Sequence, residues 1–202
     1  LVHTANKGGM RAGLRAKALE ICAGFSKDKL KTQLTQFNNA LFYAEPEVQI
    51  ALAKVFVKIG PEALDRLSFN LTQTFWRRRR NSAFVLGEMG KAALKAAPLL
   101  LQACKDSSGA VRNAAVDALF KIGPDSAPEI LAFIDASPAP RQRQLLQISV
   151  RWGDRSAVHL PRLLTYVDKA KSAEGNVMAL RFLATLSKSS PELEKSIVSA
   201  LN

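Results

Sequence analysis

Four consecutive arginines, Arg77 to Arg80, are the residues of this chain with the clearest capacity for chemistry. They stand in the segment TFWRRRRNSAFVLGEMG, residues 74–90. Guanidinium groups bind carboxylates and phosphates through paired N–H donors, so a cluster of arginines predicts a site for a polyanion. The segment continues as an amphipathic helix, however, so we expect one or two of the arginines to have a structural role in that helix and not to contact a ligand.

The helical period divides the four arginines among different faces. Successive residues of a helix are rotated by about 100°, so the four side chains cannot all meet one ligand. Arg78 falls on the packing stripe, which predicts that it pairs with a carboxylate or reaches out to water. Asn81 and Ser82 lie on the same stripe, and they predict poor packing of the first turn. Arg77 and Arg80 share a face that is open to solvent or a partner.

Residues for catalysis or metal binding are scarce. The chain has two histidines, His3 and His159, and two cysteines, Cys22 and Cys104, without a CxxC or HxxxH pair. The glycine-rich stretch KGGMRAG, residues 7–13, lacks the spacing and the preceding strand of a phosphate-binding loop. The sequence therefore predicts no enzyme, no metal and no cofactor. Both cysteines stand in apolar helical surroundings, which predicts buried free thiols.

The charge balance favours an acidic partner. The 202 residues include 29 Lys and Arg against 17 Asp and Glu, which gives a net charge of +12 and a pI of about 10.1. Nucleic acid, an anionic membrane surface and an acidic protein all fit such a balance. There is no signal-peptide pattern and no apolar run of about 18 residues, so we expect a cytoplasmic chain without a transmembrane segment.

A helical segment ending in glycine recurs along the chain. The four copies span residues 47–60, 77–90, 110–123 and 141–153, and their glycines are 30, 33 and 30 residues apart. In the third copy apolar residues follow Val111 at i+3, i+4, i+7, i+8 and i+11, which is one continuous helical stripe. Gly123 then ends the helix, because glycine accepts a left-handed backbone. A second helix follows each glycine, as Pro61 after Gly60 indicates.

The repeats predict an all-α chain. Weaker helical pairs at both ends bring the total to about six antiparallel hairpins in one repeat domain, residues 1–202. No segment alternates with a period of two between hairpin turns, so we expect no sheet. The predicted units are residues 1–44, 45–73, 74–106, 107–138, 139–172 and 173–202.

The segments PEVQIALAKVFVKIGPEAL and AVRNAAVDALFKIGPDSAPEIL resemble HEAT repeats, in particular the short HEAT-like units of bacteria. The resemblance implies a right-handed α-solenoid whose second helices line the concave face. It also implies a ladder in which a basic residue early in each first helix contacts acids of the loops. Arg79 and Arg112 match that basic position, whereas Gln49 and Gln142 replace it in the neighbouring units. HEAT arrays host many unrelated roles, so the resemblance says more about fold than about function.

Basic charge alternates along the predicted units, whose net charges are +5, −1, +5, −2, +5 and 0. Stacking would turn the first, third and fifth units into three basic bands, although attraction between neighbouring units of opposite sign explains the alternation equally well. Two placements of the bands stay open. On the concave face they would consist of Lys27, Lys31, Lys91, Lys95, Arg155 and Arg162; on the edge near the turns they would consist of Arg77, Arg80, Arg141 and Arg143.

We therefore expect a non-enzymatic interaction scaffold. It would bind an acidic protein partner through Arg77, Arg79, Arg80 and the basic residues of the first and fifth units. One alternative is non-sequence-specific binding of a DNA or RNA backbone, and another is a structural subunit of a larger assembly. A HEAT-like DNA glycosylase is disfavoured, because its cleft needs a tryptophan with a carboxylate. Here Arg80 stands one turn after Trp76, and Trp152 takes a core position.

Overall fold

A computed structural model of the chain describes residues 11–135 and positions 145, 147, 148, 151, 152, 183, 184, 191, 194, 195 and 198. The described residues form helices and turns, and no strand occurs among them, which confirms the all-α prediction. The chain falls into two compact units, Leu1–Ile122 and Gly123–Asn202. This division lies inside the predicted unit 107–138. A single repeat domain over residues 1–202, like the right-handed course of the array, stays a prediction.

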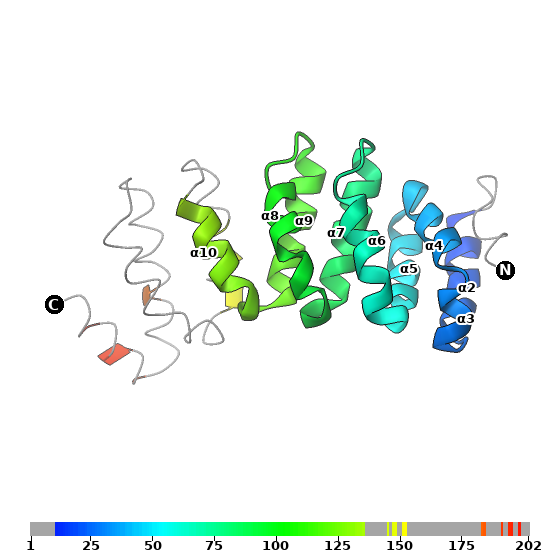
Figure 1. Ribbon diagram of the computed structural model, residues 1–202, viewed down its shortest axis with the longest axis horizontal. Coiled ribbons are helices and arrows are strands. Elements are labelled where there is room, and N and C mark those ends of the chain that lie inside the picture. Colours follow the sequence, from blue (N-terminus) through cyan, green and yellow to red (C-terminus); the bar gives the residue numbers. More distant parts are fainter. Residues whose placement is uncertain are drawn as a thin grey trace. The chain divides into compact units, whose positions relative to one another are not determined.

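Within the first unit, helical pairs stand side by side (Figure 1). The first helices pack in sequence, α2 on α5, α5 on α7 and α7 on α9. Their bounds are α2 (Ala12–Ala23), α5 (Pro46–Ile59), α7 (Trp76–Glu88) and α9 (Gly109–Ile122). The second helices of the pairs are α3 (Lys27–Lys31) with α4 (Leu34–Ala40), α6 (Leu64–Asn70) and α8 (Ala97–Ala103).

Short 3-10 turns link these helices. They are η1 (Leu41–Tyr43), η2 (Gly60–Ala63) and η3 (Gly90–Ala96). The described part of the second unit holds η4 (Pro124–Ser126) and α10 (Ala127–Asp135). In the first pair the second helix is divided into α3 and α4. The Thr32 hydroxyl donates to the Lys29 carbonyl (2.8 Å) at the break, a local hydrogen bond that competes with the helical pattern.

The recurring glycines end the first helices as predicted. Gly60, Gly90 and Gly123 have φ values of 78°, 56° and 102°, a region that other residues rarely adopt. At Gly60 the ψ is −143°, so the backbone lies outside the left-handed helical region. Only glycine tolerates this combination of φ and ψ. Pro61 then opens η2 at its first turn. These turns fix where each second helix begins.

The core of the first unit lies between the two layers of helices. On α9 the predicted stripe is confirmed: Val111, Ala115 and Leu119 are fully buried, and only Ala114 is half-buried. Full burial of a large apolar side chain contributes about 1.5–3 kcal/mol, so these contacts hold neighbouring pairs in register. Cys22 and Cys104 are buried free thiols, as predicted, and burial raises the pKa of the Cys22 thiol.

Candidate functional site

Helix α7 begins directly at the arginine run. Phe75 precedes the helix with an extended backbone (φ −84°, ψ 110°), and no side chain caps the first turn. The first amide groups of a helix have no partner within it, and together with the helix dipole they favour negative charge nearby. The first turn of α7 thus adds to the positive potential of its arginines.

Arg79 is held inside the protein. Its Nε and Nη2 donate to the two carboxylate oxygens of Asp106 at 2.6 and 2.8 Å, and its Nη1 donates to the carbonyls of Gln73 and Thr74. The exposed fraction of the side chain is 13% for Arg79 and 9% for Asp106. Each guanidinium nitrogen of Arg79 therefore donates at least one hydrogen bond, and together these bonds join the loop before α7 to the loop before α9.

The surroundings of Asp106 change the pKa of its carboxyl group. Burial is the largest single influence and raises its pKa. The hydrogen bond from Arg79, the amide of Ser108 and the charges of Arg79 and Arg112 outweigh burial and hold the pKa of Asp106 below its ordinary value. Asp106 therefore carries its charge at neutral pH and completes a buried ion pair.

The equivalent positions of the neighbouring repeats make the same local contact. Arg112 donates to the carbonyls of Asp106 and Ser107, and Gln49 donates to the carbonyl of Ala44 (2.8 Å). Gln49 thus keeps the contact to the loop without a charge. Arg79 acts as the structural ladder residue that the HEAT resemblance implies.

Arg78 has no carboxylate partner among the described residues and is half-buried, so of the two predicted alternatives only contact with water stays open. Its guanidinium lies over the ring of Phe42, 5.1 Å from the centroid, and its Nε is buried without a hydrogen-bond partner. Phe42 stacks in turn on Phe75, with centroids 4.1 Å apart and planes within 5°. Sequence reasoning missed this aromatic pair, because the two rings are distant along the chain.

Arg77 and Arg80 flank Trp76. Their guanidinium carbons lie 4.9 and 5.7 Å from the centroid of its ring, which confirms that the two arginines share a face. Burial, and then the charge of Arg77, lowers the pKa of Arg80. Within the described part of the chain neither arginine has a carboxylate at ion-pair distance; Arg80 Nε donates only to Asn81 Oδ1 at 3.0 Å.

Asn81 and Ser82 correct the expectation of a poorly packed first turn. Both are fully buried, and both are hydrogen-bonded. Asn81 Nδ2 donates to the Leu41 carbonyl (2.6 Å), and Asn70 Nδ2 donates to Ser82 Oγ (3.0 Å) and to Asn38 Oδ1 (2.6 Å). Buried polar groups with partners specify a packing arrangement, and these hydrogen bonds hold the start of α7 against η1 and α6.

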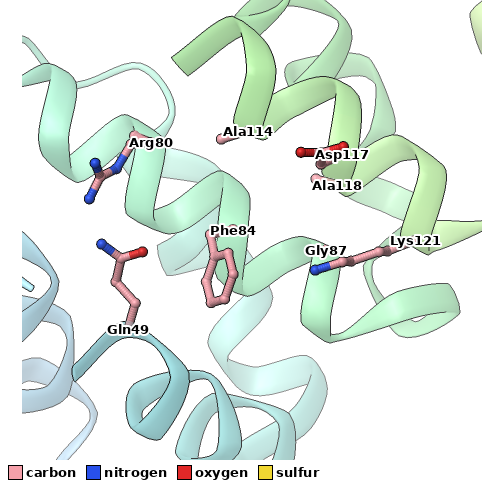
Figure 2. A pocket seen from close by; sticks show the side chains of 8 residues that line it. All are labelled: Gln49, Arg80, Phe84, Gly87, Ala114, Asp117, Ala118 and Lys121. Atoms are coloured by element: carbon pink, nitrogen blue, oxygen red, sulfur yellow. The ribbon is translucent and has the colours of Figure 1, made fainter. Parts of the chain in front are cut away.

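The side of α7 that faces away from the second helices is hollowed. One hollow of about 390 Å³ lies between α5 and α7, and a second of about 300 Å³ extends over α7 to α9. Figure 2 shows the second hollow, with Arg80 opposite Gln49 and the ring of Phe84 between the helices. Phe84 borders both hollows.

The lysines predicted for the concave face are only partly available. Lys27 and Lys31 both pair with Glu62 of η2, at 3.1 and 2.6 Å. Lys91 is exposed and has an interaction partner; Lys95 is exposed and has no ion pair among the described residues. The remaining predicted residues lie outside the described part of the chain: Arg141, Arg143, Arg155 and Arg162.

Other chemistry is not assembled in the described part of the chain. No group of three His, Cys, Asp or Glu side chains there is placed to hold a metal ion. None of the helices described combines the length and the apolar character that crossing a bilayer demands. Trp152 is buried, with 2% of its surface exposed, which confirms its core position. A cytoplasmic location stays a prediction from the sequence.

Comparison with known proteins bears on the fold. No curated protein matches the chain. The crystal structure of an engineered protein is similar at 16% identity and a TM-score of 0.42, covering 93% of this chain and 96% of that chain; a score of this size supports no further argument. A family model described as HEAT repeats matches residues 68–151. Over residues 68–151 this match supports the HEAT resemblance, and the helical pairs described there agree with it.

Proposed function

We propose that the chain is a non-enzymatic interaction scaffold that binds an acidic protein partner at the start of α7. HEAT arrays are interaction scaffolds far more often than catalysts. The surface consists of Arg77, Arg78 and Arg80 with the rings of Trp76, Phe42 and Phe75, and it is called the arginine–aromatic surface below. The observation that carries the proposal is that these three arginines gather without a carboxylate among the described residues.

Stacking on aromatic rings prepares the arginines for carboxylates. A guanidinium that lies over a ring keeps its N–H donors free at its edge, and the ring restricts its motion before a ligand arrives. Arg77 lies over both Trp76 and Phe75, and Arg78 lies over Phe42. The ring faces are thus already covered, which favours carboxylate side chains over nucleobases that need an open ring to stack on.

Arg79 supports the proposed surface by holding α7 in place and not by contacting the partner. Its donors are engaged with Asp106 and the loop carbonyls, so it positions α7 and leaves contact with the partner to its neighbours. Lys95 and the basic residues of the fifth unit, among them Arg141, Arg143, Arg155 and Arg162, stay proposed as separate contacts for an acidic partner, because the net charge of +12 favours such a partner.

The test is binding of a labelled glutamate-rich peptide, followed by fluorescence anisotropy. The variant Arg77→Glu/Arg80→Glu should lose binding. The control Lys17→Glu/Arg66→Glu removes the same charge at exposed positions of α2 and α6 and should retain most of the affinity. Equal loss in both variants would mean that net charge alone attracts the peptide, and the proposed surface would be wrong.

Binding of a nucleic-acid backbone is the second candidate, because the net charge of +12 favours it. Labelled single-stranded and duplex DNA and RNA, titrated over a salt series, decide between the two. Tight nucleic-acid binding that falls steeply with salt and disappears in Arg77→Glu/Arg80→Glu would move the function to this candidate. Weak binding that both charge variants reduce equally would leave the acidic protein as the partner.

A further inference from the structure

A trough runs along α7 on the side away from the second helices. Its floor is one stripe of α7, and its walls belong to α5 and α9, which are all parts of the first unit. The two hollows of about 390 and 300 Å³ meet there at Phe84. We name this feature the α7 trough and define it by Arg80, Phe84 and Gly87 on the floor, Ile50 and Val57 on one wall, and Ala118 and Lys121 on the other.

Gly87 brings the α9 wall of the trough close to α7. The corresponding positions, three residues before the terminal glycine, hold Val57 in α5 and Phe120 in α9. A Cβ atom on Gly87 would lie 2.9 Å from the Cα of Ala118, so α7 and α9 approach as closely as the backbone allows. Glycine inside a helix costs about 1 kcal/mol relative to alanine, and here it allows α7 and α9 to pack closely.

The wall on α5 is apolar and exposed. Ile50 and Val57 are 52% and 46% exposed, and they stand seven residues apart on one face of the helix. Half-buried Phe84 and buried Ala53 continue the apolar surface into the hollow. Apolar side chains at this spacing along a groove fit a ligand helix with its own apolar stripe.

The charges around the trough differ between its ends. At the start of α7, Arg80 lies beside Arg77 without a carboxylate among the described residues. At the far end Lys121 pairs with Glu88, and Lys54 on the α5 wall pairs with Glu20. Asp117, on the α9 wall, already has an interaction partner. The trough therefore combines an apolar wall on α5 with charged side chains that have partners, and at one end it presents the charge of Arg80, which forms no ion pair with a described residue.

We infer that the α7 trough binds an amphipathic helix of the acidic partner, with an apolar stripe on Ile50, Val57 and Phe84 and a carboxylate at one end against Arg80. This inference rests on the proposed function, because it gives the form that the acidic partner takes. The ligand helix needs three to four turns, since α7 itself spans 13 residues and so about 20 Å.

The experiment uses three synthetic peptides of about the length of α7. The first has leucines at i, i+4 and i+7 and two glutamates at one end. The second replaces the leucines with glutamine, and the third replaces the glutamates with glutamine. Binding to the full chain is followed by fluorescence anisotropy. The first peptide should bind at least about tenfold more tightly than either of the others, because two kinds of contact are satisfied together.

A matched pair of variants locates the binding. Ile50→Ser/Val57→Ser removes the apolar wall and should reduce affinity for the first peptide to that of the leucine-free peptide. Leu14→Ser/Ile21→Ser changes the corresponding residues of α2, which are 59% and 51% exposed and lie outside the trough, and it should leave the affinity unchanged. All four side chains are substantially exposed, so circular dichroism should show the same helicity in both variants.

The outcomes separate the two proposals. If the leucine-free peptide binds as well as the first, the trough inference is wrong and the arginine–aromatic surface stands. If no peptide with glutamates binds, both are wrong. Equal effects of the two serine pairs would place the peptide elsewhere and overturn the inference. The inference would also be wrong if the wild-type protein formed a dimer and Ile50→Ser/Val57→Ser dissociated it, because a second copy of the chain would then cover the trough.

Discussion

At Arg79 one guanidinium joins two loops. It binds both oxygens of Asp106 and two carbonyls of the loop before α7. A surface ion pair contributes little to stability, whereas one partner of a mostly buried pair cannot be removed without leaving the other charge unpaired. The same residue type thus serves stability at Arg79, whereas at Arg77 we propose that it serves recognition.

Asp106→Asn tests this structural role. The substitution leaves the Arg79 guanidinium without its counter-charge, and we expect a loss of about 2–3 kcal/mol in the free energy of unfolding, somewhat below the loss for a fully buried pair. Urea denaturation measures the difference. Asp65→Asn changes an exposed aspartate of α6 in the same way and should shift stability by less than about 0.5 kcal/mol. Equal effects would show that Asp106 is an ordinary surface residue.

Some contacts of the arginine run could be predicted from the sequence, and others could not. The HEAT resemblance led to the ladder position of Arg79, and the helical period predicted the shared face of Arg77 and Arg80. The partners of Arg78 and Asn81 were not predictable, because Phe42 and the Leu41 carbonyl belong to η1 at the end of the first hairpin, and α5 and α6 separate η1 from α7 in the sequence. A polar residue on a packing stripe indicates a buried side chain that needs a hydrogen-bond partner, but only the fold shows which group that partner is.

Among the elements, α7 and α9 pack closely against each other at Gly87. Gly87→Ala would place a Cβ atom 2.9 Å from Ala118 Cα and 3.2 Å from its Cβ, so the two helices must separate. We expect a loss of about 1–3 kcal/mol from overpacking, which exceeds the gain in helix propensity. In α2 the nearest atom to a Cβ on Gly13 would be 3.8 Å away, and Gly13→Ala should instead stabilise the protein by about 0.5–1 kcal/mol.

Thermal denaturation of the two alanine variants checks the signs. Opposite shifts in Tm support the close approach of α7 and α9. A gain in stability at both positions would mean that α9 yields easily, and the account of the close packing at Gly87 would fail with it.

Glu62 ties the second helix of the first hairpin to η2. Hydrogen bonds from Lys31, from its own backbone amide and from Lys27 lower the pKa of Glu62 to about 2, from an ordinary value of 4.5. A folded-state pKa below the unfolded value means that Glu62 contributes stability above about pH 4.5, and that this contribution is lost as the pH falls toward 2.

Glu62→Gln should therefore lower Tm at neutral pH and differ less from the wild type as the pH approaches 2. Thermal denaturation across pH 2–7 measures this convergence. Glu20→Gln removes a glutamate that pairs with the single lysine Lys54 at 3.3 Å, and it serves as the control. A constant difference between Glu62→Gln and the wild type at every pH would rule out the ion pairs as its cause.

For the whole molecule, the repeated glycines and the 3.6-residue periodicity were enough to predict the helical pairs. Gly60, Gly90 and Gly123 all adopt the positive φ that ends a first helix. The charge bands were harder to interpret, because net charge along the sequence does not show which side chains neutralise one another. Glu62 forms ion pairs with Lys27 and Lys31 of the first band, whereas Arg77 and Arg80 form no ion pair with a described residue and lie beside Trp76.

The trough could not be predicted either. It follows from small differences between equivalent positions, where Val57 in one repeat corresponds to Gly87 in the next. Hydrophobic periodicity treats these positions alike, and only the packing distances between helices reveal the hollow.

Thermal denaturation with and without a saturating glutamate-rich peptide tests the central claim, which is the division of labour within the arginine run. A ligand that binds only the folded protein raises Tm, so one scan reports both stability and binding. Arg79→Ala should have a lower Tm but keep the peptide-induced rise. Arg77→Ala/Arg80→Ala should have nearly the wild-type Tm and lose the rise. The reverse pattern, with stability lost at Arg77 and Arg80 and binding lost at Arg79, would contradict the account.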